Sequence, residues 1–129
     1  MAINTTYTQN GNTGAVDSRA PKVGRLTLGA DSITAADFLQ QEVGFTPRYI
    51  RVWNVTDRVS IEWFEGMAAN TALKTAAAGT QTLETSNGGI TICDSDGTAN
   101  TSGRYFKILQ NSSLAVVLAS KVLTWVAFQ

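Results

Sequence analysis

Two consecutive stretches, PRYIRVWNV at residues 47–55 and RVSIEWFE at residues 58–65, carry the strongest alternation of side chains in this chain. In each stretch, apolar side chains recur at every second position, which is the period of a β-strand with one buried face. The polar residues 56–58 between them form a tight turn. The two stretches therefore predict an antiparallel β-hairpin.

The rest of the chain repeats this pattern of short apolar runs separated by turn residues. Further strands are expected near residues 23–29, 80–86, 89–93, 104–109 and 121–128. The last of them, KVLTWVAF, is apolar on both faces, which predicts a position in the middle of a sheet or between layers, with Trp125 largely buried. The pattern predicts an all-β fold, an antiparallel β-sandwich or a barrel, jelly-roll-like in type.

Three segments leave their secondary structure open. Residues 31–42 fit either a short helix capped by Asp31 or Ser32, or a strand with a bulge. Residues 67–79 are rich in alanine and end in glycine, which fits a short surface helix or a long loop. Residues 111–120 are expected to form an apolar cluster with serine caps and one helical turn.

The N-terminal segment differs in composition from the remainder of the chain. Residues 1–20 are small and polar and show no periodicity, so they predict a flexible arm in front of a single β domain at residues 21–129. The arm is either a disordered terminus or a segment that becomes ordered against a neighbouring subunit. The start of the chain lacks a basic and an apolar region, so no signal peptide is expected.

Composition weighs against several classes of function. Ten basic and ten acidic residues give a net charge of zero, which argues against binding to duplex nucleic acid. The absence of histidine removes Ser–His and Cys–His catalysis and most zinc sites, and the single cysteine cannot form an internal disulfide. No apolar run is long enough to span a membrane. Only 16% of the residues are charged, which suggests a surface that packs against other molecules.

Two acidic clusters are candidate sites. Asp94, Asp96, Gly97 and Asn100 are spaced like part of a calcium loop, but they lack further oxygen ligands and are ordinary turn residues. Glu62 and Glu65 lie beside aromatic residues, as acids do in glycosidase clefts. On a strand, however, residues three apart point to opposite faces, so they do not converge.

The aromatic and basic residues of the hairpin have two interpretations each. The side chains of Tyr49, Trp53, Trp63 and Tyr105 form a sugar-binding platform or, in the favoured interpretation, part of the core. Arginines 48, 51 and 58 bind an acidic surface or RNA or, in the favoured interpretation, form local ion pairs with Asp57, Glu62 and Glu65.

The remaining candidates have structural explanations. Cys93, at a strand end, is expected to be a small buried apolar residue. The N-x-S/T matches at Asn4, Asn54, Asn100 and Asn111 are attributed to chance in a chain rich in serine and threonine. The sequence therefore predicts no catalytic, cofactor-binding or metal-binding residues, no cofactor and no enzymatic activity.

Residues 43–92 resemble a family of small virion proteins of tailed bacteriophages. The resemblance is carried by GFTPRYIRVWN, by EWFEGM, by an Ala/Thr-rich middle and by a Gly-rich turn into ITI. It extends more loosely over residues 109–128, which end in a WVAF strand, and barely touches residues 1–40. The Cys-Asp-Ser-Asp stretch at residues 93–96 departs from the family pattern.

The resemblance implies a structural role. Members of that family are taken to be head-associated or capsid-associated proteins, so the chain is expected to be a non-enzymatic capsid decoration or cement protein. Its expected partners are the major capsid protein and further copies of itself, as a trimer or dimer, with no nucleic acid and no membrane. Its expected location is the capsid surface of the virion, assembled in the host cytoplasm. The alternatives are a carbohydrate-binding or adaptor module on a tail or tail fibre, and a head–tail connector subunit.

Overall fold

The hairpin predicted from the alternating stretches is formed. The computed structural model describes residues 7–9, 20–31, 33–34, 37–86 and 88–129. Strands β4 (Tyr49–Asn54) and β5 (Val59–Phe64) pair antiparallel, with Tyr49 opposite Phe64 and Asn54 opposite Val59. Along both strands one set of alternate side chains is buried, as the two-residue period requires.

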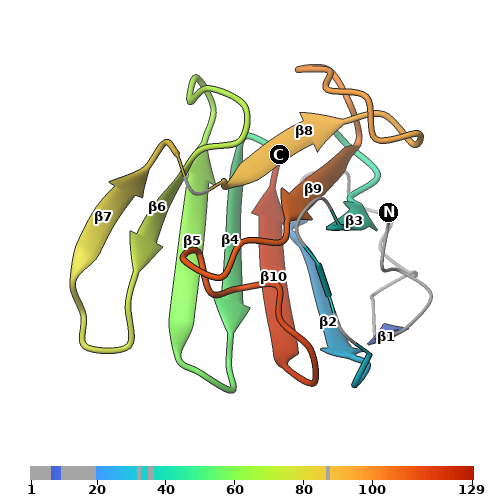
Figure 1. Cartoon of the computed structure of the whole chain (residues 1–129). Helices are drawn as coiled ribbons and strands as arrows, with labels where there is room; N and C mark the ends of the chain where they lie inside the picture. Colours follow the sequence, from blue (N-terminus) through green and yellow to red (C-terminus); the bar gives the residue numbers. More distant parts are fainter. Residues whose placement is uncertain (1–6, 10–19, 32, 35–36, 87) are drawn as a thin grey trace.

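The described residues form ten strands in two antiparallel sheets (Figure 1). The large sheet has the order β1-β2-β10-β4-β5-β6-β7 and the small sheet the order β3-β9-β8. The two sheets pack face to face without closing into a barrel, so the sandwich is the predicted architecture that forms. The remaining strands are β1 (Tyr7–Gln9), β2 (Lys22–Leu28), β3 (Phe38–Glu42), β6 (Ala72–Thr75), β7 (Gln81–Glu84), β8 (Ile90–Cys93), β9 (Tyr105–Leu109) and β10 (Val122–Phe128).

Strand β10 lies inside the large sheet, as predicted, although only one of its two apolar faces is buried. It pairs with β2 on one side and with β4 on the other. Trp125, at its centre, is 0% exposed, and its ring meets Phe106 of the small sheet edge to face at a centroid distance of 5.1 Å. Gly24, opposite Trp125 on β2, leaves room for the indole, because a Cβ at this position would overlap the ring. This contact joins the two layers at the core.

The alanine-rich segment at residues 67–79 is neither a helix nor a long loop, so both predictions for it were wrong. Its residues 72–75 form β6, which pairs with β5 on one side and β7 on the other. Alanine favours a helix, but the segment has too few large apolar residues to bury a helical face, whereas two neighbouring strands satisfy its backbone groups. Gly79 has a φ of 94°, used in the β6–β7 turn and not at a helix end.

The other two open segments are resolved by side-chain hydrogen bonds. Of the alternatives for residues 31–42, the strand forms over Phe38–Glu42, as β3. Before it, the Asp37 carboxylate accepts the Thr34 backbone N–H at 2.9 Å; Ser32 and residues 35 and 36 lie outside the described residues. In residues 111–120 turns form at 112–114 and 119–120, without a helix, and the first turn is not capped by a serine. The Asn111 side-chain oxygen accepts the backbone N–H of Ser113 at 2.8 Å.

The predicted arm falls mainly on residues 1–6 and 10–19, which lie outside the described residues. Its residues Tyr7–Gln9 form β1, which pairs with the last three residues of β2 at one end of the large sheet. In the described part of the chain, no helix has the length and apolarity needed to cross a bilayer.

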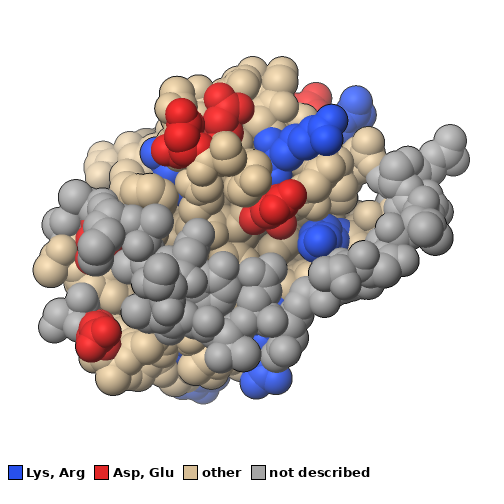
Figure 2. All heavy atoms as spheres, turned by 90° about the vertical axis from the view of Figure 1, so that its right-hand side faces the viewer, with Lys and Arg blue, Asp and Glu red and all other residues tan. Residues whose placement is uncertain are grey.

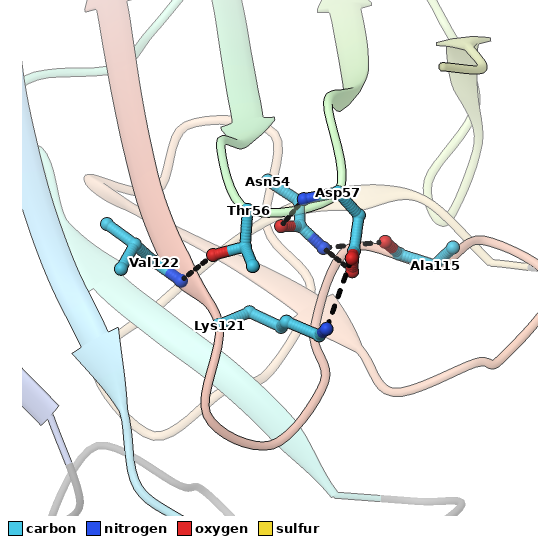
Figure 3. Close-up of polar contacts among 6 residues, drawn as sticks. All are labelled: Asn54, Thr56, Asp57, Ala115, Lys121 and Val122. Carbon is cyan, nitrogen blue, oxygen red and sulfur yellow. Dashed lines mark hydrogen bonds and ion pairs between the residues drawn. The ribbon is translucent and has the colours of Figure 1, made fainter. Parts of the chain in front are cut away.

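A polar cluster fixes the β4–β5 turn to the connection between β9 and β10 (Figure 3). The amide of Asn54, which is fully buried, donates to Asp57 Oδ2 at 2.9 Å and to the Ala115 carbonyl at 3.1 Å. Lys121 Nζ contacts Asp57 Oδ1 at 3.1 Å. The hydrogen bond from Lys121, followed by that from Asn54, lowers the pKa of Asp57. The cluster is therefore a structural junction. It gives the buried Asn54 side chain a structural role, so the N-x-S/T match at this residue needs no glycan to explain it.

Candidate interaction surface

The outer face of the large sheet, which points away from the small sheet, carries the exposed large apolar side chains. Among the described residues there are five of these: Val23, Val55, Phe64, Leu83 and Phe128. Strand register and alternation place all five on this one face. Phe64 and Phe128 meet at Tyr49, whereas Val55 follows the other end of β4, and Arg51 and Glu62 lie between Val23 and Leu83. The contiguous apolar group on this face, of the kind that marks an interaction surface, is therefore the aromatic one.

Three aromatic residues meet at one corner of the outer face. Tyr49 of β4 stands between Phe64 of β5 and Phe128 of β10, which are its direct neighbours in the register. The ring centroids are 5.0 Å apart for Tyr49–Phe64 and 5.8 Å apart for Tyr49–Phe128. Phe64 is 45% exposed and Phe128 is 42% exposed. We call this cluster the aromatic corner.

Polar contacts surround the aromatic corner and hold it in place. The Tyr49 hydroxyl donates to Glu62 Oε2 at 2.5 Å. Burial of the phenol, together with this bond to a carboxylate, raises the pKa of Tyr49 to about 12, so the ring stays neutral at physiological pH. At the rim, Arg48 Nε lies 3.2 Å from Glu65 Oε2, and both side chains are well exposed. An aromatic centre with a charged rim is the usual anatomy of a protein interface.

Apolar residues also flank the centre of the outer face. One row of directly opposed residues crosses the sheet, and it runs Val23, Val126, Arg51, Glu62, Leu73, Leu83. Its ends are aliphatic and its middle is charged. The Arg51 guanidinium carbon lies 4.7 Å from the Trp53 ring centroid. The guanidinium therefore covers one side of the Trp53 indole.

The side of the molecule seen in Figure 2 carries charged side chains of both signs. Lysine, arginine, aspartate and glutamate are interspersed there among uncharged residues, and neither sign dominates the described surface. This view agrees with the zero net charge of the chain. The described surface seen there has no basic stripe of the kind that neutralises phosphates.

The calcium-like stretch is a set of hydrogen-bonded turns. The Asp94 carboxylate accepts the Asn100 amide at 3.0 Å, and Asp96 Oδ1 accepts the Thr98 backbone N–H at 2.9 Å. This second contact lowers the pKa of Asp96. Among the described residues, no three His, Cys, Asp or Glu side chains gather closely enough to hold a metal ion. The carboxylates thus have structural partners, in agreement with the turn interpretation.

The paired glutamates do not converge. Glu62 accepts the Tyr49 hydroxyl, whereas Glu65 lies beyond the end of β5 and pairs with Arg48. The Arg48–Glu65 contact confirms a local ion pair. The predicted partner of Asp57 was wrong, because Asp57 pairs with Lys121 from the connection that precedes β10 and not with an arginine of the hairpin. Arg58 lies exposed in the turn with a φ of 59°.

The four aromatic residues expected in the core lie in three places: Trp63 on the inner face of the large sheet, Tyr49 and Trp53 on its outer face, and Tyr105 on β9 of the small sheet. Trp63 is buried and belongs to the core cluster, with its indole N–H lacking a hydrogen-bond partner. Tyr49, Trp53 and Tyr105 are only half-buried and lie outside the core cluster, so the core prediction was wrong for them. Because Trp53 and Trp63 lie on opposite faces of the large sheet, they cannot form one flat platform.

Cys93 is a fully buried thiol, as predicted, and desolvation raises its pKa to about 11. It ends β8 beneath the 94–103 loop, where Gly103 packs against the Cys93 backbone carbonyl. A buried, protonated thiol is unreactive. The structure thus places Cys93 among the structural residues.

Comparison of the chain with protein-family models, with curated proteins and with solved structures yields no match. The interaction surface therefore rests on the residues of this chain alone. Sequence reasoning missed the aromatic corner, although one signal was present. Tyr49, Arg51 and Trp53 share a strand face, and a charged residue within that set indicates a face in contact with solvent.

Proposed function

We propose that this chain is a non-enzymatic virion structural protein of a tailed bacteriophage, a capsid decoration or cement protein that binds the outer head shell and stabilises contacts between capsomers. The observation that carries the proposal is the contact of the exposed Phe64 and Phe128 with Tyr49 on the outer face of the large sheet, the face that also carries the other exposed large apolar side chains of the described residues. The resemblance of residues 43–92 to small virion proteins supplies the biological setting.

The partner on this face is the major capsid protein. Phe64 and Phe128 supply large apolar contact area at little conformational cost, and Tyr49 holds both rings in position. The Arg48–Glu65 pair at the rim offers both signs of charge, which selects orientation more than it adds affinity. The protein also associates with itself, and it is located on the capsid surface after assembly in the host cytoplasm.

The N-terminal residues 1–20 act as an assembly arm in this proposal. Apart from β1, which pairs with β2, the arm offers few apolar residues against an ordering cost of roughly 1–2 kcal/mol per residue. Contact with the shell or with a sister subunit provides additional partners, for example by strand addition. This role explains the contrast between an unpatterned arm and a patterned domain.

The tail or tail-fibre module that binds carbohydrate has less support. Such a module needs flat aromatic faces turned to solvent, but Trp63 lies in the core and one side of Trp53 is covered by Arg51. The three rings of the aromatic corner are tilted to one another, at 54° and 49°, and do not form a plane.

The test is cosedimentation of the purified protein with phage heads that lack it. Phe64→Ser removes an anchor of the aromatic corner, and Phe38→Ser makes the same change on the outer face of the small sheet, where Phe38 is half-buried under Lys107. We expect Phe64→Ser to weaken binding at least tenfold, about 1.4 kcal/mol, and Phe38→Ser to leave it unchanged. Failure of the wild-type protein to bind, or equal losses in both variants, would overturn the proposal.

A further inference from the structure

Strand β7 forms an open end of the large sheet. Among the described strands it is the last in the order and pairs with β6 alone, and it lies at the left-hand edge in Figure 1. Backbone groups on the open side of such a strand are available to another chain. The structure assigns a specific use to this edge, which is antiparallel pairing with β7 of a second copy.

The β6–β7 turn determines which backbone groups point outward. The Ala76 N–H donates to the Thr80 carbonyl at 2.9 Å, and the Gly79 N–H donates to the Ala76 carbonyl at 2.8 Å. From this start, hydrogen bonding alternates along the antiparallel pair. Thr82 and Glu84 therefore direct their N–H and C=O groups to β6. Gln81 and Leu83 direct theirs to the open side.

The side chains of β7 do little to block another strand. Residues 80–86 contain no lysine, arginine or proline, and their only charged residue, Glu84, is buried at the end of the strand. Leu83 is 60% exposed, the highest value among the large apolar side chains of the described residues. Natural edge strands usually carry charge or proline to prevent pairing. Leu83 stands on the outer face beside the open edge, so pairing with a second strand brings neighbouring side chains against its exposed surface.

The edge is complementary to itself about a twofold axis perpendicular to the sheet. With Thr82 opposite the partner's Thr82, Gln81 lies opposite the partner's Leu83, and each such pair exchanges two N–H···O=C bonds. Outer-face side chains then meet outer-face side chains, and the two Leu83 side chains become diagonal neighbours within reach of each other. Glu84 lies opposite the partner's Thr80, so no like charges are opposed.

A second copy is the occupant that these features favour. The strand supplies equal numbers of outward donors and acceptors, and the zero net charge of the chain does not oppose self-association. The inference rests on the proposed function in one respect, since it gives the self-association proposed there a twofold interface. It does not require binding to a capsid, so the two can fail separately.

The oligomeric state of the full chain tests the interface. Sedimentation equilibrium should give twice the 13.8 kDa of one chain for the wild type. Leu83→Lys places a charge on the open edge, and Leu83→Pro removes an N–H that β6 does not use. Both should give monomers with unchanged circular dichroism. The matched control Val55→Lys, at a similarly exposed residue of the same face, should stay dimeric.

Cysteine substitution tests the register. Thr82→Cys places two thiols opposite each other at a Cα separation that accepts a disulfide, so diamide, which takes up the two electrons and two protons, should link the two chains. Gln81→Cys faces the partner's Leu83 and should give at least tenfold less dimer. The wild type should give none, because Cys93 is buried. A monomeric or trimeric wild type, a dimer that survives both Leu83 variants, or equal cross-linking at residues 81 and 82 would overturn the inference. Loss of shell binding in a protein that remains dimeric would count against the capsid role alone.

Discussion

Replacement of Trp125 by alanine removes the largest fully buried side chain of the described residues. A tryptophan buries roughly 200 Å² on folding, which at about 25 cal/mol per Å² corresponds to about 5 kcal/mol. The substitution also removes the edge-to-face contact with Phe106 and the indole donor that lies 3.4 Å from Gln41 Oε1. Partial collapse of the cavity offsets some of this loss. We expect the free energy of unfolding to fall by about 3–5 kcal/mol.

Urea denaturation followed by far-UV circular dichroism measures this loss, and thermal melting should show a midpoint lower by roughly 10–20 °C. The control is Trp53→Ala, because Trp53 is half-buried on the outer face and its described ring contact is with Arg51. That variant should lose about 1 kcal/mol or less. An unchanged midpoint for Trp125→Ala, or equal losses in both variants, would refute the assignment of Trp125 to the core between the sheets.

Particular contacts support three further predictions. Gly24→Ala should lower the free energy of unfolding by about 1–3 kcal/mol, because the new methyl group overlaps the Trp125 indole. The same substitution should cost less in a Trp125→Phe background. If the losses of the two single variants simply add in the double variant, the contact is contradicted. Hydrogen bonds lower the pKa values of Asp57 and Asp96 below 3.8, so the stabilisation that they provide is present above that value and is lost as the pH falls through the lowered values. Since the chain has no histidine, the melting temperature should be nearly constant from about pH 5 to 7. Below about pH 4 it should fall, and it should fall less steeply in the Asp57→Asn variant. A melting temperature that stays constant down to about pH 2 would contradict this. Deletion of residues 1–20 removes only the short end strand β1 from the described sheets, so the fold should persist while binding to phage heads weakens. If heads decorated with the truncated protein show full occupancy and unchanged heat resistance, the arm has no role in assembly.

The sequence was sufficient where local pattern and final environment agree. The β4–β5 hairpin and the central position of β10 follow from side chains that alternate over six or seven residues, because burial of one or both strand faces imposes that pattern. The buried state of Trp125 and Cys93 follows in the same way. The all-β class needed no more than these runs and the turn residues between them.

The features that depend on strand order follow from long-range pairing and not from local sequence. Strand β6 forms from alanine-rich sequence because β5 and β7 lie on either side of it, and this pairing outweighs a helix preference worth a few tenths of a kcal/mol per residue. The aromatic corner joins residues 49, 64 and 128, and a register that brings β10 beside β4 is not encoded in either strand alone. The open side of β7 likewise exists only because no described strand follows it in the sheet. Local sequence specifies which face of a strand is apolar, whereas long-range pairing determines which of those faces and edges remain exposed.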